Sequence, residues 1–424
     1  MLLLPVALTG VGVARAAPGA SVDLVKVQGV VDPALASYVR GSIRSAERAG
    51  ATVILQIDSR GSYDGQAEEL GRFIRRATVP VVAWVGPTGA RAAGGALFLV
   101  YSSGLVALAP GAGIGPGRPF DLGTKASAES PSTVAAGEAA LQRLAQGAGV
   151  SPGGVRRALS GPALPAGPAV EAGAAGLIAT DVIDLLRKLD GRSLLTPGGQ
   201  VTLRTANGTG QRVEVRFHEI GLLQRVLHAV STPTAVYVLL VFGLWLVAFE
   251  LTQPGFGVAG IGGVAALGLA GYGLAVIPVS WPGLALIVAG IGLQGLDVAV
   301  RRVAWLTLGG TALFAAGSIL AWRGLAPAID LSAWLIVLST LAGALFFGFG
   351  MTVAMRSRER ARTAQVGLVG LVGEARGDLN PEGAVFVKGS LWRARSSNGP
   401  IPKGRRIRVR GIEGLILRVE EEPD

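Results

Sequence analysis

Cysteine is absent from this chain, and histidine is almost absent. The 424 residues contain no Cys and only two His, His218 and His228. Without thiols, disulfides, thiolate catalysis and cysteine-ligated metal sites are excluded. The positions of the two histidines also argue against a histidine metal cluster or a Ser-His-Asp triad in the N-terminal region. The sequence therefore predicts no metal and no cofactor.

Charge is scarce as well. Only 16% of the residues are charged and the mean hydropathy is +0.50, which does not suit one soluble domain. Between Val226 and Val300 the only charged side chains are Glu250 and Asp297, whereas one membrane span needs only about 20 apolar residues. Breaks at Pro, Gly and Arg predict five spans in a transmembrane domain over 232–355: 233–252, 256–277, 281–299, 303–322 and 331–354. For the second and third spans, a hairpin re-entering the same face also fits.

Arginine in the short segments predicts the orientation. Arg301 and Arg302 follow the third predicted span, and the linker 356–366 follows the fifth with four more arginines. Because such clusters stay on the cytoplasmic side, five spans leave the N-terminal region outside the cell membrane and the C-terminal region in the cytoplasm. The formal charge of +11 lies largely beside the spans, which favours anionic lipid over nucleic acid as the charged partner.

The start of the chain agrees with this orientation. Met1–Val13 is apolar, and Ala14-Arg15-Ala16 resembles a signal-peptidase site. A basic n-region is missing, so residues 1–17 are interpreted as a signal peptide or an uncleaved anchor.

The region that follows alternates two hydrophobic periods. Short apolar runs typical of strands occur at 22–27, 53–57, 79–85 and 105–109, and helical spacing occurs at 33–49, 66–77, 134–146 and 152–159, with a strand running into a helix over 177–189. Strands that alternate with helices predict βαβ units and a mainly parallel sheet over residues 18–200. Functional loops of such sheets lie at the carboxyl ends of the strands.

Two further segments complete the predicted organisation. Residues 201–231 are interpreted as a linker ending in an interfacial helix over Val215–Val230, with both histidines at the level of the lipid head groups. Residues 367–424 alternate polar and apolar residues between Gly and Asn-Gly turns, which predicts a small closed barrel. Only Phe386 and Trp392 are aromatic there, and Trp392 suits a core position better than a stacking platform for bases.

Several motifs in one order resemble the NfeD family, the ClpP-class membrane serine proteases encoded beside stomatins. They are Asp32-Pro33, Leu55–Gly61, Gly86–Ala93, Ala109–Gly115, Ala172–Ala179, Glu250–Gly257, and the C-terminal blocks Gly373–Ala375, Leu379–Gly383 and Val387–Trp392 with Ala394. The resemblance implies an α/β ClpP/crotonase-like N-terminal domain, a multi-span α-helical membrane domain and a C-terminal OB-fold barrel.

The resemblance also implies a catalytic pair that this chain lacks. The family's protease uses a Ser-Lys dyad, in which a lysine of lowered pKa takes the proton of a serine. The serine position falls on Gly94 and the lysine position on Ser132, and the nearest lysine is Lys125. The turn expected to donate N–H groups to an oxyanion retains Gly61 but has Arg60 where proline is usual. The sequence therefore favours a protease fold without its catalytic residues.

Relocated catalysis is the alternative. The candidate nucleophiles are the nearby serines Ser59, Ser62, Ser102 and Ser103, with Lys125 as the base. The competing interpretation assigns all four serines to turns and links between elements.

Other polar residues have a structural and a functional interpretation. Asp58 and Asp64 could act as an acid and base pair or could cap a turn. Gly111–Gly117 could cradle a phosphate but lacks the Lys-Ser/Thr ending of a P-loop. Glu250 suits an interfacial position better than a proton relay, and Asp297 has Arg301 four residues later on the same helix face.

Two functions follow from these observations. One is a non-catalytic scaffold, with the lipid bilayer and a stomatin/SPFH-family membrane protein as partners. The other is a membrane-bound serine endopeptidase with relocated residues. ClpP-like folds usually associate, so a homo-oligomer is expected in either case, and peptide binding is compatible with both.

Overall fold

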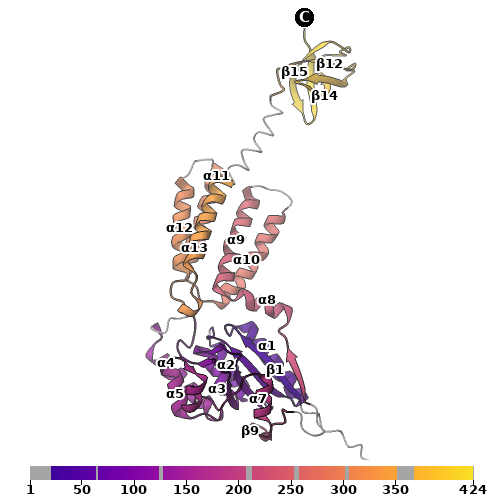
Figure 1. The fold of residues 1–424 in the computed structure, drawn as a ribbon. Helices are drawn as coiled ribbons and strands as arrows, with labels where there is room; N and C mark the ends of the chain where they lie inside the picture. The colour runs from indigo at the N-terminus through magenta and orange to yellow at the C-terminus, as the bar shows by residue number, and fades with distance from the viewer. Residues whose placement is uncertain are drawn as a thin grey trace, which may run out of the picture. The chain divides into compact units, whose positions relative to one another are not determined.

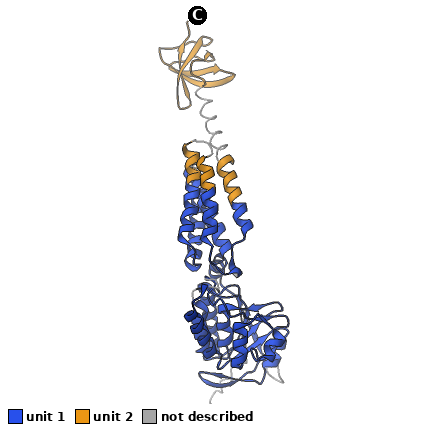
Figure 2. Ribbon diagram, turned by 90° about the vertical axis from the view of Figure 1, so that its left-hand side faces the viewer, with its two compact units in different colours: residues 1–292, 312–339 blue, residues 293–311, 340–424 orange. Residues whose placement is uncertain are grey.

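The computed structural model describes residues 21–63, 65–123, 128–206, 213–252, 257–300, 305–350 and 367–423. It divides into two compact units, coloured separately in Figure 2: Met1–Gly292 with Ala312–Ser339, and Leu293–Thr311 with Thr340–Asp424. The first unit contains an α/β domain and most of the apolar helices. The second ends in a small barrel.

A six-stranded parallel sheet forms the centre of the α/β domain (Figure 1). Its order is β11-β1-β2-β3-β5-β8, and every neighbouring pair is parallel. The strands are β1 (Ser21–Gln28), β2 (Thr52–Asp58), β3 (Val81–Val85), β5 (Leu105–Leu108), β8 (Leu177–Ile178) and β11 (Glu214–His218). The inner strands β2, β3 and β5 are nearly continuous buried runs, as expected where helices cover both faces. The predicted α/β class and parallel sheet are confirmed.

Helices connect the strands, and polar caps set where several of them begin. They are α1 (Pro33–Ala49), α2 (Gln66–Arg75), α3 (Leu97–Ser102), α4 (Pro131–Ala145), α5 (Pro152–Ser160), α6 (Ala166–Glu171) and α7 (Val182–Leu189). Asp32 caps α1 by accepting from Leu35 N at 2.7 Å, and Pro33 follows at the first helical position. Gly50 ends the same helix in the left-handed conformation that glycine adopts readily. Short strands β4 (Arg91–Ala92), β6 (Gly113–Ile114) and β7 (Leu164–Pro165) form a second sheet, and β9 (Ser193–Thr196) pairs with β10 (Gly199–Thr202).

The segment before the first apolar helix differs from the prediction. A single helix over Val215–Val230 is wrong for its first part, because β11 (Glu214–His218) pairs with β1 as the edge strand of the sheet. The helix is shorter, α8 (Leu222–Val230). Pairing with β11 gives hydrogen-bond partners to backbone groups at the otherwise open edge of β1. The hydrophobic periodicity of a short segment does not reveal such a long-range pairing.

Five apolar helices follow, at the places where five spans were predicted. They are α9 (Pro233–Thr252), α10 (Val258–Val276), α11 (Trp281–Val300), α12 (Trp305–Ala321) and α13 (Ala333–Leu345), the last continued by a π-helical turn, η4 (Phe346–Gly350). Within the described residues, α9, α10 and α11 are long and apolar enough to cross a membrane, and the other two are shorter apolar helices. Helices α9 and α10 approach closely at Gly243 and Gly263. A Cβ added to Gly243 would lie 3.1 Å from the carbonyl oxygen of Gly263, and a Cβ added to Gly263 would lie 3.0 Å from that of Gly243.

The C-terminal part is a closed five-stranded barrel, consistent with the predicted OB-type fold. Its strands are β12 (Val372–Ala375), β13 (Glu382–Val387), β14 (Ser390–Ser396), β15 (Arg406–Glu413) and β16 (Ile416–Glu421), in the order β12-β13-β14-β16-β15. The core includes Val385, Ala394, Ile407 and Leu417, and the partly buried Trp392 packs against it. Trp392 thus contacts the core but is not fully inside it as predicted.

Candidate functional site

Gly94 opens the short 3-10 helix η1 (Gly94–Ala96), directly before α3. Its φ is +55°, and a Cβ added there would lie 2.5 Å from the carbonyl oxygen of Pro119 and 3.3 Å from that of Arg60. Cβ atoms do not approach backbone oxygens within 3.0 Å. A serine therefore does not fit at this position unless the backbone around Pro119 moves.

Residues 119–123, called the plug segment below, cover the predicted oxyanion turn. The Leu122 side chain is buried, with its Cγ 2.7 Å from where a Cβ of Gly61 would lie, and Leu122 N donates to Ser62 O at 2.9 Å. The Gly61 N–H, predicted to stabilise an oxyanion, points toward Ser59 Oγ at 3.5 Å. The turn is thus occupied by the chain's own residues.

A buried carboxylate holds the plug segment in place. Glu129, whose side chain is only 3% exposed, accepts from Phe120 N at 2.7 Å and from Arg118 Nε at 3.0 Å. Charge-assisted hydrogen bonds of this kind are stronger than neutral ones. Hydrogen bonds to Glu129 therefore hold the plug segment over Gly94 and Gly61.

The four serines proposed as relocated nucleophiles are buried and bonded to carbonyl groups. Ser59 Oγ donates to Gly61 O at 3.1 Å, Ser62 Oγ to Phe120 O at 3.4 Å, Ser103 Oγ to Leu99 O at 3.1 Å, and Ser102 Oγ to Phe98 O. In the described part of the chain, none of these hydroxyls is bonded to a lysine or a histidine. Within the described residues, no base is therefore placed beside any of these serines.

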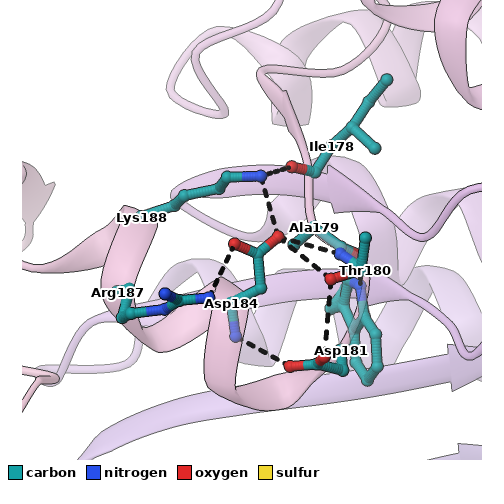
Figure 3. A network of polar contacts seen from close by, with 8 residues as sticks. Ile178, Ala179, Thr180, Asp181, Asp184, Arg187 and Lys188 are labelled. Atoms are coloured by element: carbon teal, nitrogen blue, oxygen red, sulfur yellow. Dashed lines mark hydrogen bonds and ion pairs between the residues drawn. The ribbon is translucent and has the colours of Figure 1, made fainter.

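The structure describes only some of the other predicted positions. Lys125 and Asp64, named as a base and as half of a carboxylate pair, lie outside the described residues. Ser132 is exposed in the first turn of α4, with its Oγ 2.9 Å from Ser130 Oγ, which caps the helix. Lys188 is held in the network of α7 in Figure 3, where its Nζ lies 2.8 Å from Asp184 Oδ2 and 2.9 Å from Ile178 O. Lys188 thus links the first turn of α7, through Asp184, to the end of β8, through Ile178.

The remaining polar candidates of this domain have structural contacts. Asp58 accepts from Arg91 N at 3.0 Å and so joins β2 to β4. The glycine-rich turn packs against α5, since an added Cβ on Gly115 would meet Ala158 O at 2.3 Å. Among the described residues, no group of three or more His, Cys, Asp and Glu side chains could hold a metal ion.

Comparison with known proteins decides the family. The family model for the NfeD integral membrane domain matches residues 234–352, and that for the NfeD-like C-terminal, partner-binding domain matches residues 366–421. The chain is 30% identical over 388 residues to the membrane-bound protease PH1510 of Pyrococcus horikoshii. The aligned residues cover 87% of this chain and 86% of that protein. The chain belongs to the NfeD family. The resemblance inferred from the motifs is confirmed.

Two of the solved structures similar to this NfeD protein come from Pyrococcus horikoshii. The 1510-N membrane protease specific for a stomatin homolog from Pyrococcus horikoshii is 23% identical, with a TM-score of 0.42, over 50% of this chain and 98% of that one. The C-terminal domain of stomatin operon partner protein 1510-C is 45% identical, with a TM-score of 0.14, over 15% of this chain and 100% of that one.

Both histidines of this NfeD protein bind buried aspartates of the sheet domain. His218 Nε2 lies 3.0 Å from Asp23 Oδ2, and Arg216 Nε lies 2.8 Å from Asp23 Oδ1. His228 Nδ1 lies 2.7 Å from Asp32 Oδ2, and its Nε2 lies 3.0 Å from Gln28 O. The sequence carried a signal for the first pair, because Asp23 is the one acidic residue within the apolar run 22–27, and a buried carboxylate needs a partner.

The protonation of His228 follows from its two partners. A carboxylate and a backbone carbonyl both accept hydrogen bonds, so both ring nitrogens donate when the ring is the imidazolium. Burial lowers the pKa of His228, but the hydrogen bond and the charge of Asp32 outweigh it, and the pKa is raised above its ordinary value. The pairing therefore favours a charged His228.

The carboxylates of the membrane domain also have local partners. Glu250 Oε2 accepts from Gly260 N at 3.3 Å. Asp297 Oδ2 accepts from Thr307 Oγ1 at 2.6 Å and Thr307 N at 3.2 Å, which joins α11 to α12. Arg301, the expected partner of Asp297, lies outside the described residues. Each contact joins neighbouring helices.

Proposed function

We propose that this NfeD protein is a membrane scaffold that does not cleave peptides and that organises a stomatin/SPFH-family membrane protein through its C-terminal barrel. The geometry at Gly94 carries the first half of the proposal. The nucleophile position has no side chain, and the oxygen of Pro119 occupies the space that a serine Cβ would need. Peptide binding without cleavage, at a surface outside this closed turn, is compatible with the proposal.

A serine-reactive fluorophosphonate probe tests the loss of catalysis. We expect no covalent labelling of the full-length protein in detergent, because the buried serines donate to carbonyl groups and face no described base. Ser59→Ala and Ser102→Ala are the matched variants. Labelling of the unmodified protein that disappears in either variant would overturn the proposal.

The alternative is a membrane-bound serine endopeptidase with relocated residues. The observation that favours it is the 30% identity to a membrane-bound protease across 86% of its length. The same probe separates the two functions.

Partner binding by the barrel is supported by the family model of its residues, described as partner-binding. The relatives 1510-C and 1510-N are a stomatin operon partner protein and a protease specific for a stomatin homolog. On the barrel surface, Phe386 and Leu391 face each other across β13 and β14, and both side chains are exposed. This apolar pair is our candidate contact.

Co-purification of the full chain with a co-expressed stomatin homologue tests the contact. Leu391→Asp should abolish co-purification, whereas Leu415→Asp, at another exposed leucine of the barrel, should not. Equal recovery with both variants would exclude the Phe386 and Leu391 surface.

The proposed orientation has the sheet domain outside the cell membrane and the barrel in the cytoplasm. It rests on the arginine clusters and on five spans. A reporter fused after Asp424 should be active only in the cytoplasm; activity on the outer side would exclude this orientation. Homo-oligomerisation is part of the proposal and can be measured by light scattering in detergent.

A further inference from the structure

Helix α8 carries an exposed apolar face directly before the first membrane helix. Leu222 is 77% exposed, Leu223 71% and Val226 38%. At 3.6 residues per turn these three positions lie within one arc of about 100° on the helix surface. Exposed leucine pairs on a short helix are costly in water, so this face needs a partner.

The opposite side of α8 is already occupied. His228 lies roughly half a turn from the centre of the apolar face and binds Asp32 and Gln28 of the sheet domain. This contact determines which side of α8 faces the domain. The leucines therefore point away from the sheet.

The apolar face leads toward the membrane helices. Val230, at the end of the same face, is buried, and its carbonyl oxygen lies 2.6 Å from where a Cβ of Gly273 in α10 would be. Three residues after Val230, α9 begins at Pro233. One end of the face is thus in contact with a membrane helix, and the exposed leucines continue from it.

We infer that α8 lies in the membrane interface with Leu222, Leu223 and Val226 among the lipid acyl chains and head groups, while His228 holds the sheet domain to its other side. A lipid surface is the occupant because the face is continuous with the membrane domain and its exposed members are aliphatic. Amphipathic helices bind bilayers by burying such a face in the head-group region. Helix α8 then docks the sheet domain at the bilayer surface, because its apolar side contacts lipid and its His228 side contacts the sheet domain. This inference is independent of whether the protein cleaves peptides.

The absence of cysteine makes a direct test possible. A single thiol is introduced into the full chain by Leu223→Cys or, separately, Leu222→Cys, labelled with an environment-sensitive fluorophore and reconstituted in phosphatidylcholine vesicles. The quencher is a lipid with a nitroxide close to its head group. Ile183→Cys on α7 is the matched control, since Ile183 is also an apolar residue 71% exposed on a helix of the same domain.

We expect the label at 223 or 222 to be quenched at least ~2-fold more than the label at 183. Quenching no greater than at 183 would overturn the inference. Energy transfer between labels of two copies, without quenching by lipid, would show that a second copy covers the face and would also overturn it. Two reporter positions keep the test decisive if one label disturbs folding, which circular dichroism of each variant would reveal.

Discussion

His228 Nδ1 lies 2.7 Å from Asp32 Oδ2, so the helix that precedes the first membrane span is bonded to the residue that caps α1. Asp32 uses its other oxygen to accept from Leu35 N. One buried carboxylate therefore serves both the start of α1 and the attachment of α8.

The first prediction concerns pH. Because the pKa of His228 is raised in the folded protein, the stabilisation by its pair with Asp32 is complete below the unfolded value of about 6.5 and is lost as the pH rises through the folded value. The melting temperature of the full chain should therefore fall as the pH rises from about 6.5 through the folded-state pKa of His228. His228→Gln should remove this pH dependence, lowering the melting temperature at pH 6 and changing it little at high pH. An unchanged pH profile in the variant would contradict the assignment.

The second prediction concerns the closed nucleophile position. Gly94→Ser should destabilise the sheet domain by about 1–3 kcal/mol, because the new Cβ meets Pro119 O. Gly50→Ser is the matched control, since Gly50 has a similar φ of +66° but open space around its Cβ position. Gly50→Ser should show only the backbone cost, about 1 kcal/mol. Chemical denaturation measures both, and equal losses would show that Gly94 is not sterically closed.

The third prediction extends this point to catalysis. Gly94→Ser combined with Ser132→Lys restores both residue types of the family dyad, yet it should not react with a fluorophosphonate. The plug segment still covers Gly61, and Ser132 is an exposed residue at the start of α4. Labelling of the double variant would show that the turn opens on its own.

The fourth prediction concerns the edge strand. Arg216→Ala leaves the fully buried Asp23 with His218 as its remaining ion-pair partner and should cost about 1–3 kcal/mol. Amide hydrogens of β11 should exchange faster with solvent. Arg187→Ala, which removes an exposed ion pair with Asp184, should change neither quantity appreciably.

The fifth prediction concerns the barrel. Leu417→Ala removes a fully buried side chain and should destabilise the barrel by about 2–5 kcal/mol, whereas Leu415→Ala, 78% exposed in the same hairpin, should change its stability by about 0.5 kcal/mol or less. The intrinsic fluorescence of Trp392, which packs on this core, can follow unfolding against a background variant lacking other tryptophans. Similar losses in both variants would contradict the core assignment.

Local patterns predicted most of the individual elements. The run 33–49 is α1 to the residue, because Asp32-Pro33 and Gly50 are strong start and stop signals. β11 and β12 could not be found this way: the first is defined by pairing with a strand almost two hundred residues away, and the second by closure of a barrel. Tertiary pairing, which periodicity does not encode, decides such strands.

The candidate site was only partly predictable. The substitution at Gly94 is visible in the sequence, but the closure by Pro119 and Leu122 depends on where the plug segment folds back. The sequence predicts that both histidines lie near the lipid head groups because they precede a span, but it does not reveal that they pair with Asp23 and Asp32 at the start of the sheet domain. Asp23 stands out as the one acidic residue of its apolar run, but residue spacing does not identify its distant partner.

The pairing of β11 with β1 has a consequence for synthesis. β1 is complete at residue 28, but its outer neighbour is not translated until residues 214–218, just before the first apolar helix. Because domains fold largely as their chain emerges, the sheet stays one strand short until membrane insertion of α9 is about to begin. Maturation of the sheet domain and entry of the chain into the bilayer are therefore consecutive events, separated by fewer than twenty residues of translation.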